Sequence, residues 1–464
     1  MISRSKLFGT NGVRGVFGKD LTLDLIIDLS YSLATFYRSG PIIVGYDGRN
    51  SSQIVSQVIR STFNSAGIDV GNAGLIPTPC LQYAAKRLGY NGGIMVTASH
   101  NPSEFNGIKP SKADGVEISR EEESAVESIF FSKQFSKLNG TGTGFDDRRI
   151  IGSYLDAVTQ LVDAEKIQRR GFVIAIDPGN GVQTIVAPIL AKRLGCRVVT
   201  TNSTIDGTFP ARGSEPTVNN LSTLSCIVRG ANADVGVAYD GDGDRSIFCD
   251  EKGVIHSGDK TAAKIVGHLL RTKHEGANVV CPINTTMAVS KVANDAGSKV
   301  IHTRVGSVEV SREMIRTKSI LGLEENGGFM YGKLNEVRDG VMTTALVLDM
   351  MASENQSLSS LMASLPKTFQ YKAKFICDNS TAQEIVRACR EHGSYRRLEA
   401  LDGAKIWIDS ETWVMVRASG TEPLVRMYAE STDQMLLDSK AREYQRLIES
   451  TIEKSKPFEN RQHF

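Results

Sequence analysis

Three aspartates alternate with glycines in the segment YDGDGDR. Asp240, Asp242 and Asp244 follow an apolar stretch, VGVA, that is typical of a buried strand. Carboxylate oxygens at this spacing are suited to one hard divalent cation such as Mg²⁺. Three carboxylates so close together repel one another unless a cation neutralises them. The segment therefore predicts a metal site, with a simple Asp-Gly hairpin turn as the alternative without chemistry.

A calcium-binding loop is the nearest alternative for the same residues, because Glu251 stands at the twelfth position counted from Asp240. The sixth position of such a loop needs glycine, and here it is Arg245. The pattern also predicts strands rather than helices on both sides of the segment. Both observations favour Mg²⁺ over Ca²⁺.

A second segment, GGIMVTASHNPSEFNGIK, joins an apolar strand to a loop that carries Ser99, His100 and Lys109. A hydroxyl at the end of a parallel strand lies where α/β folds bind their ligands. A serine hydrolase would need a G-x-S-x-G motif and a histidine from elsewhere in the chain, whereas His100 is adjacent to Ser99 and poorly placed to deprotonate it. An Asn-Pro turn with no chemical role is the other alternative.

Two segments place arginine in turns that are suited to an anion. RASGTEP, between two predicted strands, offers the backbone of a glycine turn, hydroxyls and arginines, in Arg417, Ser419, Gly420, Thr421 and, beyond the turn, Arg426. This combination is typical of sites for phosphate. Near the N-terminus, LFGTNGVRG places Arg14 between two turns, within reach of an anion. In both cases an ordinary hairpin loop is the alternative.

A fifth segment, GLEENGGFMYG, sets Glu324 and Asn326 in a glycine loop. A carboxylate acceptor beside an amide is suited to the hydroxyls of a sugar, although this pattern alone is weakly specific.

The elements that position these loops form a repeat. An apolar strand, a turn-rich loop, an amphipathic helix ending at Gly and a second apolar strand begin at Pro41, Phe172 and Asn278. The three helices close at Ala66-Gly67, Leu194-Gly195 and Ala296-Gly297, where a left-handed C-terminal turn favours glycine. Strand–helix–strand units predict parallel or mixed sheets covered by helices, and three of them predict three related α/β domains.

The C-terminal part of the chain has a different order. From about Pro366 the pattern predicts a strand, a helix, three strands and a long helix with one apolar face, formed by Leu437, Ala441, Tyr444, Ile448 and Ile452. This order is typical of a separate, smaller α+β domain. We expect four domains, at residues 1–150, 151–253, 254–366 and 367–464. A capping box of Ser119 and Glu122 marks a further helix start, and we assign it no function.

Composition narrows the class of protein. The 464 residues are 41% hydrophobic and 23% charged, close to the average of globular proteins. Fifty-four Lys and Arg against 52 Asp and Glu give a net charge of +2, which argues against a protein built to bind nucleic acid or an anionic membrane. We find no apolar run long enough for a membrane span and no signal peptide. Seven scattered cysteines are expected to be reduced, and the protein cytoplasmic.

Together, TASHNP, DGDGDR and RASGTEP resemble the motifs of the α-D-phosphohexomutase family, whose members move phosphate between C1 and C6 of hexoses. The resemblance covers nearly the whole chain and implies three α/β domains with mixed sheets and a smaller C-terminal α+β domain around a central cleft. It also implies a small-molecule sugar phosphate as the partner and one Mg²⁺ per chain as the cofactor. The oligomeric state is left open.

The resemblance assigns roles to residues of this chain. It implies that Ser99 carries a phosphoryl group and, with Asp240, Asp242 and Asp244, holds the metal. It implies proton transfer by His100 or Lys109, and contacts with the reacting phosphate from Arg14 and Arg245. The residues implied to bind the sugar and its second phosphate are Gly306, Glu324, Asn326, Arg417, Ser419, Gly420, Thr421 and Arg426.

One position departs from the family. Several members have histidine in a G-E-x-S-G-H pattern, whereas this chain has LEENGG, with Asn326 in place of serine and Gly328 in place of histidine. A role for that histidine therefore does not carry over. We expect glucosamine phosphate as the substrate, with mannose or glucose phosphate as the alternative. A magnesium-dependent phosphatase and a non-catalytic sugar-phosphate-binding protein are competing hypotheses from other classes.

Overall fold

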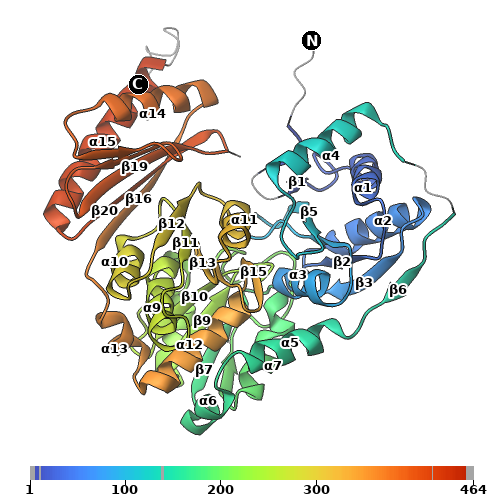
Figure 1. Cartoon of the computed structure of the whole chain (residues 1–464), viewed down its shortest axis with the longest axis horizontal. Coiled ribbons are helices and arrows are strands. Elements are labelled where there is room, and N and C mark those ends of the chain that lie inside the picture. Colours follow the sequence, from blue (N-terminus) through green and yellow to red (C-terminus); the bar gives the residue numbers. More distant parts are fainter. Residues whose placement is uncertain (1–5, 10–11, 137–139, 421, 456–464) are drawn as a thin grey trace.

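The computed structural model describes residues 6–9, 12–136, 140–420 and 422–455. Four sheets with their helices follow one another along the chain, and we call these units domains I to IV (Figure 1). Domains II and III lie together at the centre of the view, with domain I on one side and domain IV on the other (Figure 1). The architecture confirms the predicted fold class of three mixed α/β units and a smaller C-terminal unit.

Domain I is built on a six-stranded sheet of order β1-β5-β4-β2-β3-β6, in which β5 runs antiparallel to its neighbours β1 and β4. Its strands are β1 (Val13–Val16), β2 (Ile42–Tyr46), β3 (Val70–Leu75), β4 (Gly92–Val96), β5 (Phe105–Lys112) and β6 (Gly144–Asp146). Its helices are α1 (Leu23–Tyr37), α2 (Ser52–Ser65), α3 (Thr78–Arg87) and α4 (Arg120–Ser132). The predicted capping box is confirmed at the start of α4, where Ser119 and Glu122 bond reciprocally.

Domain II has a four-stranded sheet of order β10-β9-β7-β8, with β9 and β10 forming an antiparallel hairpin. Its strands are β7 (Val173–Asp177), β8 (Arg197–Thr200), β9 (Val235–Tyr239) and β10 (Ser246–Asp250). Its helices are α5 (Ile150–Gln160), α6 (Ala164–Arg170), α7 (Ala187–Arg193) and α8 (Ser222–Gly230), with short 3₁₀ turns η1 (Val182–Ile185) and η2 (Val218–Asn220).

Domain III has a five-stranded mixed sheet of order β12-β11-β13-β14-β15. Its strands are β11 (Val279–Pro282), β12 (Val300–Thr303), β13 (Leu321–Leu323), β14 (Phe329–Tyr331) and β15 (Asn335–Arg338). Its helices are α9 (Gly258–Thr272), α10 (Met287–Asp295), α11 (Ser307–Thr317), α12 (Gly340–Glu354) and α13 (Leu358–Ala363).

Domain IV has an antiparallel sheet of order β16-β20-β19-β18-β17, covered by two helices. Its strands are β16 (Phe369–Ile376), β17 (Arg397–Glu399), β18 (Ala404–Trp407), β19 (Thr412–Ala418) and β20 (Leu424–Ser431), and its helices are α14 (Asn379–Glu391) and α15 (Gln434–Ser455). The predicted apolar face of α15 is confirmed in its main part, because Leu437, Ala441, Tyr444 and Ile448 are buried.

The predicted repeat is confirmed as three parallel strand pairs joined by a helix, β2-α2-β3, β7-α7-β8 and β11-α10-β12. The glycine after each helix adopts the predicted left-handed conformation, with φ of 84° at Gly67, 78° at Gly195 and 68° at Gly297. A side chain is strained in this conformation, so glycine ends these helices without cost.

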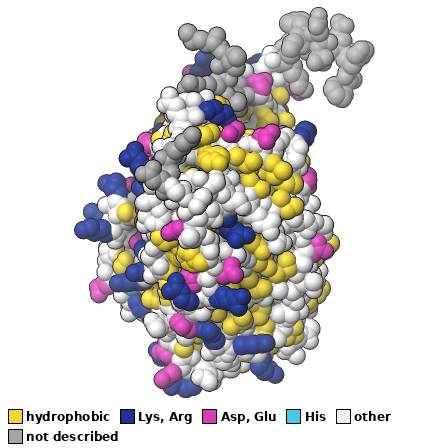
Figure 2. Space-filling view, turned by 90° about the vertical axis from the view of Figure 1, so that its right-hand side faces the viewer, with side chains coloured by type: hydrophobic (Ala, Val, Ile, Leu, Met, Phe, Trp, Pro, Cys, Tyr) yellow, Lys and Arg dark blue, Asp and Glu magenta, His cyan; other side chains and the backbone are white. Residues whose placement is uncertain are grey.

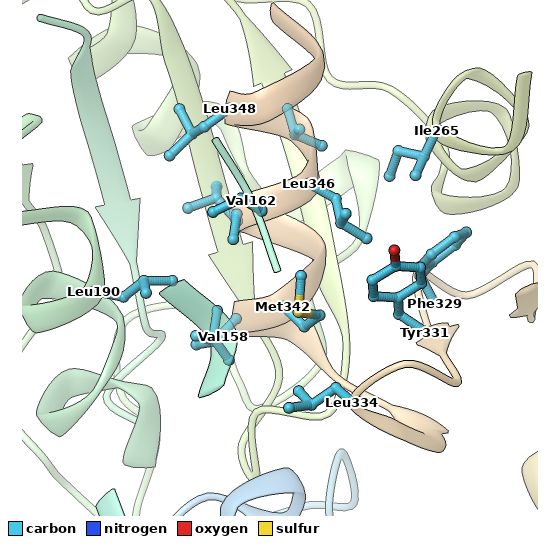
Figure 3. Close-up of a cluster of buried hydrophobic side chains, with 14 of the residues drawn as sticks. Val158, Val162, Leu190, Ile265, Phe329, Tyr331, Leu334, Met342, Leu346 and Leu348 are labelled. Atoms are coloured by element: carbon cyan, nitrogen blue, oxygen red, sulfur yellow. The ribbon is translucent and has the colours of Figure 1, made fainter. Parts of the chain in front are cut away.

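Domains I to III share one hydrophobic core, which the sequence pattern does not predict. Helix α12 runs through it: Met342, Leu346 and Leu348 lie among side chains of domain II, such as Leu190, and of domain III, such as Phe329 (Figure 3). Domain IV has a separate core of its own. The loops of domains I to III are therefore fixed by common packing, whereas domain IV packs mainly on itself and meets domain III through a smaller cluster that includes Met287 and Trp413.

Three further features of the structure concern its cysteines, its helices and its surface charges. The seven cysteines are all free, and five of them are buried. Among the helices of the described residues, none has the length and the apolar composition that a membrane span requires. Basic and acidic side chains are interspersed over the face on the domain I side of the molecule (Figure 2).

Candidate active site

Ser99 lies in the loop that follows β4, three residues after the last residue of that strand. Its side chain is fully buried and its backbone is left-handed, with φ of 51°. Its backbone N–H donates to Thr97 Oγ1 over 2.8 Å, and Thr97 Oγ1 donates in turn to Asp47 Oδ2 over 2.6 Å. A non-glycine residue away from a helix end keeps this conformation only where its surroundings hold it, and such residues cluster at functional sites.

Arg49 stabilises this conformation of the Ser99 loop. Its guanidinium donates to the carbonyls of Ser99 (2.9 Å), Asn101 (2.7 Å), Pro102 (2.6 Å) and Phe105 (2.9 Å), and its Nε pairs with Asp47 Oδ2 at 3.1 Å. Both side chains of this ion pair are fully buried. The sequence analysis missed Asp47 and Arg49. Their signal was the segment DGRNSS at the end of the predicted strand IIVGY, which pairs in parallel with β4.

The three predicted metal ligands lie in the turn between β9 and β10, so the hairpin and the acidic cluster are the same feature. Asp240, Asp242 and Asp244 are all buried, and one carboxylate oxygen from each lies within 4.8 Å of the others. Glu251, the candidate twelfth ligand of a calcium loop, instead accepts hydrogen bonds from the backbone and side chain of Ser359. The structure therefore supports the preference for a three-carboxylate site.

The serine and the acidic cluster meet across the boundary between domains I and II. Ser99 Oγ donates to Asp240 Oδ2 over 2.9 Å. Thr78, at the start of α3, donates through Oγ1 to Asp242 Oδ2 over 2.6 Å and through its backbone N–H to the Asp242 carbonyl over 3.0 Å. The structure thus brings together the phosphoserine candidate and the metal ligands.

Two cations partly neutralise the aspartates. Lys109 Nζ, from β5, lies 3.2 Å from Asp242 Oδ2 and 3.5 Å from Asp244 Oδ2, and Arg338 Nη2, from β15, lies 2.5 Å from the same oxygen of Asp244. In the part of the chain that the structure describes, Asp242 Oδ1 and Asp244 Oδ1 are buried and accept no hydrogen bond. Each of these carboxylates therefore keeps one oxygen for a ligand from outside the protein.

The pKa values of Asp240 and Asp242 also fit a site for a cation. Burial and the neighbouring Asp244 and Asp242 raise the pKa of Asp240 well above its ordinary value. The pKa of Asp242 is lowered, because Lys109 and the hydrogen bond from Thr78 outweigh the effect of burial. A divalent cation supplies the charge that would keep all three carboxylates ionised, so the donor set fits Mg²⁺.

His100 and Lys109, the candidates for proton transfer, are held in opposite states. The charge of Arg245, together with burial and Arg14, lowers the pKa of His100 well below its ordinary value, so the imidazole is neutral. Its Nδ1 lies 3.3 Å from Ser99 Oγ. Burial opposes the charge of Lys109, but Asp242, Asp244 and Glu117 outweigh it and raise its pKa, so its ammonium stays protonated.

Of the predicted contacts for the reacting phosphate, Arg14 binds the serine loop itself and Arg245 lies beside Asp240. Arg14 Nη1 donates to the Ala98 carbonyl (3.0 Å) and to Asn101 Oδ1 (2.6 Å). Arg245 Nη1 donates to Glu215 Oε1 over 3.2 Å, and its Nε lies 3.9 Å from Asp240 Oδ2. Both guanidinium groups therefore lie near the Ser99 hydroxyl.

The predicted sugar loop connects β13 to β14. Glu324 is buried and accepts a hydrogen bond from Arg338 Nη1 over 2.9 Å, while Asn326 Oδ1 accepts from the backbone N–H of Gly328 over 3.2 Å. The loop is attached to the hairpin that carries the predicted metal ligands, because Ser246 N–H donates to the Gly327 carbonyl over 3.1 Å. The sequence analysis missed Arg338, which ends β15 two positions before the first residue of α12 and belongs to none of the motifs named above.

Domain IV contributes the remaining candidates. Arg417 Nε donates to Asp402 Oδ2 over 3.1 Å, and the same oxygen accepts from the backbone N–H of Val305 over 3.0 Å. Asp402 therefore links Arg417 to the residue before Gly306, which caps α11. Arg426 pairs with Glu422, whose N–H donates to Ser419 Oγ, and Gly420 lies in the same turn. Thr421 lies outside the described residues.

A pocket of about 410 Å³ lies where domains II, III and IV meet. Asn326 and Arg426 line it together, and its other polar side chains are those of Glu215, Thr217, Ser257, Glu325, Lys372, Lys374 and Tyr428. It therefore joins the sugar loop to domain IV, in agreement with the expected central cleft.

Each part of the chain matches a domain of one family. Residues 5–137, 152–253 and 257–369 match the alpha/beta/alpha domains I, II and III of phosphoglucomutase/phosphomannomutase, and residues 393–444 match its C-terminal domain. The four matches occur in the order of the four sheets.

Relatives extend over almost the full chain. The phosphoglucosamine/phosphogalactosamine mutase of Sulfurisphaera tokodaii is 36% identical, with 96% of this chain and 99% of that protein covered. The phosphoglucomutase/phosphomannomutase of Thermococcus kodakarensis is 37% identical, with 95% and 96% covered. The crystal structure of a phosphoglucomutase/phosphomannomutase family protein from Burkholderia thailandensis has the same fold, with a TM-score of 0.86 at 24% identity over 97% of this chain and 98% of that one. This chain therefore belongs to the phosphoglucomutase/phosphomannomutase family of phosphohexomutases, which are isomerases.

Proposed function

We propose that this enzyme interconverts glucosamine 6-phosphate and glucosamine 1-phosphate through a phosphoserine at Ser99 and a bisphosphorylated sugar. The observation that carries the proposal is the placement of the buried Ser99 hydroxyl 2.9 Å from Asp240 in a cluster of three carboxylates. A neutral serine hydroxyl needs no carboxylates beside it to be stable. A phosphoryl group on Ser99 is negatively charged, and it needs the cation that the three carboxylates would hold.

In this proposal Asp240, Asp242, Asp244 and an oxygen of the Ser99 phosphoryl group hold one Mg²⁺. When bound, the ion draws electron density from the phosphoryl group and offsets its charge. The two buried Oδ1 atoms of Asp242 and Asp244, which accept no hydrogen bond from the described residues, support this ligand set.

The transfer itself needs two changes of bond. A sugar hydroxyl oxygen forms a bond to phosphorus while the bond from phosphorus to Ser99 Oγ breaks. The proton of the sugar hydroxyl passes to a base and Ser99 Oγ receives a proton. His100, whose Nδ1 lies 3.3 Å from Ser99 Oγ, and Lys109, beside Asp242, are our candidates for these two transfers. Arg14 and Arg245 stabilise the charge on the phosphoryl oxygens during transfer.

Moving phosphate between two carbons requires a second anion site. We assign it to Arg417, Ser419, Gly420, Thr421 and Arg426 of domain IV, with Gly306, Glu324 and Asn326 holding the sugar. The bisphosphorylated sugar turns over in the cleft, so that its other phosphate returns to Ser99. Because domain IV has its own core, we propose that it closes over the cleft and keeps water from the phosphoserine. We also propose domain boundaries near residues 150, 253 and 366.

Glucosamine phosphate is our first choice of substrate for two reasons. The amide of Asn326 offers both a donor and an acceptor to a 2-amino group. The Sulfurisphaera tokodaii relative is named for glucosamine and galactosamine phosphates. The Thermococcus kodakarensis relative, at 37% identity, favours mannose and glucose phosphates as the second candidate. Measured kcat/KM values for glucosamine, mannose and glucose phosphates decide between them, and equal or lower values for glucosamine phosphate would overturn the first choice.

The intact mass of the purified protein tests the mechanism. We expect a fraction of the wild-type chain to carry one phosphoryl group, which disappears on incubation with excess unphosphorylated acceptor sugar and is absent from Ser99→Ala. Ser103→Ala, a nearby exposed serine, serves as the matched control and should keep the modification. A phosphoryl group elsewhere, or none after incubation with hexose 1,6-bisphosphate, would refute the role of Ser99. Release of inorganic phosphate in step with substrate loss would instead indicate a phosphatase.

A further inference from the structure

Arg338 connects two functional loops from different domains. Its Nη2 donates to Asp244 Oδ2 in the metal hairpin over 2.5 Å, and its Nη1 donates to Glu324 Oε2 in the sugar loop over 2.9 Å. The side chain is buried, as are both of its partners. As a guanidinium, it is a permanent cation.

The stem of Arg338 lies where a side chain at position 328 would be. A Cβ on Gly328 would lie 2.3 Å from Arg338 Cδ and 2.8 Å from Arg338 Cγ. Gly328 itself is outside the left-handed region, so its backbone admits a side chain and the Arg338 stem is the main obstacle. A side chain at position 328 and Arg338 in this position therefore exclude each other, which gives the sequence departure at Gly328 a physical reason.

We propose that Arg338 is a positioning residue of the mutase site, which clamps Asp244 to Glu324 and for which Gly328 makes room. This inference rests on the proposed function of the site. It goes beyond that function by assigning a role to a residue pair that links metal binding to sugar binding.

The clamp uses one oxygen of each carboxylate. Asp244 Oδ2 receives Arg338, which leaves the buried Oδ1 for the metal. Glu324 Oε2 also receives Arg338, and in our proposal Oε1 accepts from a sugar hydroxyl. The planar guanidinium presents its two terminal nitrogens at a fixed separation, so the two loops are held in one relative position. A lysine keeps the charge but has a single point of attachment.

The charge of Arg338 gives the proposal a second readout. Since the guanidinium lies beside a metal ligand, it repels a cation bound there, and its removal strengthens the attraction of the site for Mg²⁺. We therefore expect Arg338→Gln to bind Mg²⁺ more tightly while it catalyses more slowly. A variant that was merely misfolded would lose both properties together.

Three variants test the clamp, with Mg²⁺ affinity from calorimetry, melting temperature and steady-state kinetics as readouts. Arg338→Gln should lower kcat/KM by about a hundredfold, with both a raised KM and a reduced kcat, and should tighten Mg²⁺ binding by about threefold or more. Arg338→Lys should keep Mg²⁺ affinity near wild type and recover part of kcat. Arg193→Gln, which breaks a surface ion pair with Asp156, is the control and should change neither.

The close approach is tested by a double-mutant cycle. Gly328→Ala should lower the melting temperature and reduce kcat/KM by about tenfold in the wild type, and should have less than about a twofold further effect in Arg338→Ala, where the stem is absent. Gly152→Ala, at a helical glycine with open space around it, is the control substitution. Additive effects of Gly328→Ala and Arg338→Ala would overturn the proposal, as would wild-type kcat/KM in Arg338→Gln or weaker Mg²⁺ binding in that variant.

These results separate the two proposals. If the wild type shows no mutase activity or no phosphoserine, the proposed function fails, whatever the variants do. If the wild type is an active mutase and the cycle is additive, only the role of Arg338 fails.

Discussion

Ser99 Oγ and Asp240 Oδ2 lie 2.9 Å apart, although 141 positions separate the two residues in the chain and they belong to different sheets. The contact forms because β4 and β9 both end at the boundary between domains I and II, which share one hydrophobic core. The proposed catalytic hydroxyl and metal ligand lie on separate domains, and the continuous core around α12 packs these domains together and keeps the two groups aligned (Figure 3).

Replacing a single metal ligand should abolish transfer without unfolding the protein. Asp242→Asn keeps the hydrogen bond to Thr78 available but removes a charge from the cation site, so we expect kcat to fall by about a thousandfold or more. Mg²⁺ should raise the melting temperature of the wild type and leave that of the variant unchanged. Asp295→Asn, at an exposed helix end, is the control. Retained activity in Asp242→Asn would refute the metal site.

Loss of the hydrogen bonds from the Arg49 guanidinium should lower kcat more than it weakens substrate binding. A lysine cannot reach the four carbonyls that Arg49 holds, so the left-handed Ser99 loop would relax. For Arg49→Lys we expect kcat to fall by about tenfold or more, KM to change little, and stability to fall by about 1–3 kcal/mol from lost buried hydrogen bonds. The exposed Arg148→Lys should behave as wild type in kinetics and urea unfolding. A raised KM with unchanged kcat would contradict this assignment.

Substitutions in the proposed phosphate site of domain IV should mainly weaken the binding of substrate. Arg417→Ala removes a cation from the site assigned to the phosphate that is not transferred, and we expect KM to rise by about tenfold or more with a smaller change in kcat. Asp402→Asn, which removes the charge that orients Arg417, should change KM in the same direction by less. Steady-state kinetics with the 6-phosphate substrate measure both. Unchanged KM in Arg417→Ala would place the second anion site elsewhere.

Lys405 should make the stability of the domain III–IV contact depend on pH. Its Nζ donates to the Ile283 carbonyl over 2.7 Å and lies 4.1 Å from the centre of the Trp413 ring, and burial lowers its pKa to about 8. Since an exposed lysine has a pKa of about 10.4, the unfolded chain binds more protons between these values. Burying the Lys405 charge therefore lowers the free energy of unfolding by its full amount below about pH 8. This destabilisation decreases as the pH rises from about 8 to about 10.4.

The comparison of Lys405→Met with wild type tests whether the destabilisation by Lys405 decreases as the pH rises. The stability of the variant relative to wild type should be most favourable at pH 7.5 and should decline towards pH 10, as measured by urea unfolding. The exposed Lys299→Met should show a pH-independent difference. A parallel pH dependence of Lys405→Met and wild type would contradict the buried charge.

The sequence by itself determined the local features of this protein. Strand–helix–strand repeats, the glycines that end their helices and the hairpin of Asp240, Asp242 and Asp244 depend on residues close together in the chain, so spacing alone predicted them. The motif TASHNP likewise placed Ser99 in a loop after a buried strand. The chemistry of each loop could be named because residue type sets which protons, charges and lone pairs are present.

The tertiary structure decided which loops meet and what holds them. Arg49 stands in a polar segment after a strand and Arg338 in no motif, and the partners of both are carbonyls and carboxylates that only sheet order and domain packing bring within reach. The departure at Gly328 was visible in the sequence, but the arginine stem that fills its space was not. The reason is physical: a buried ion pair depends on the relative placement of elements far apart in the chain, which the shared core of domains I to III fixes.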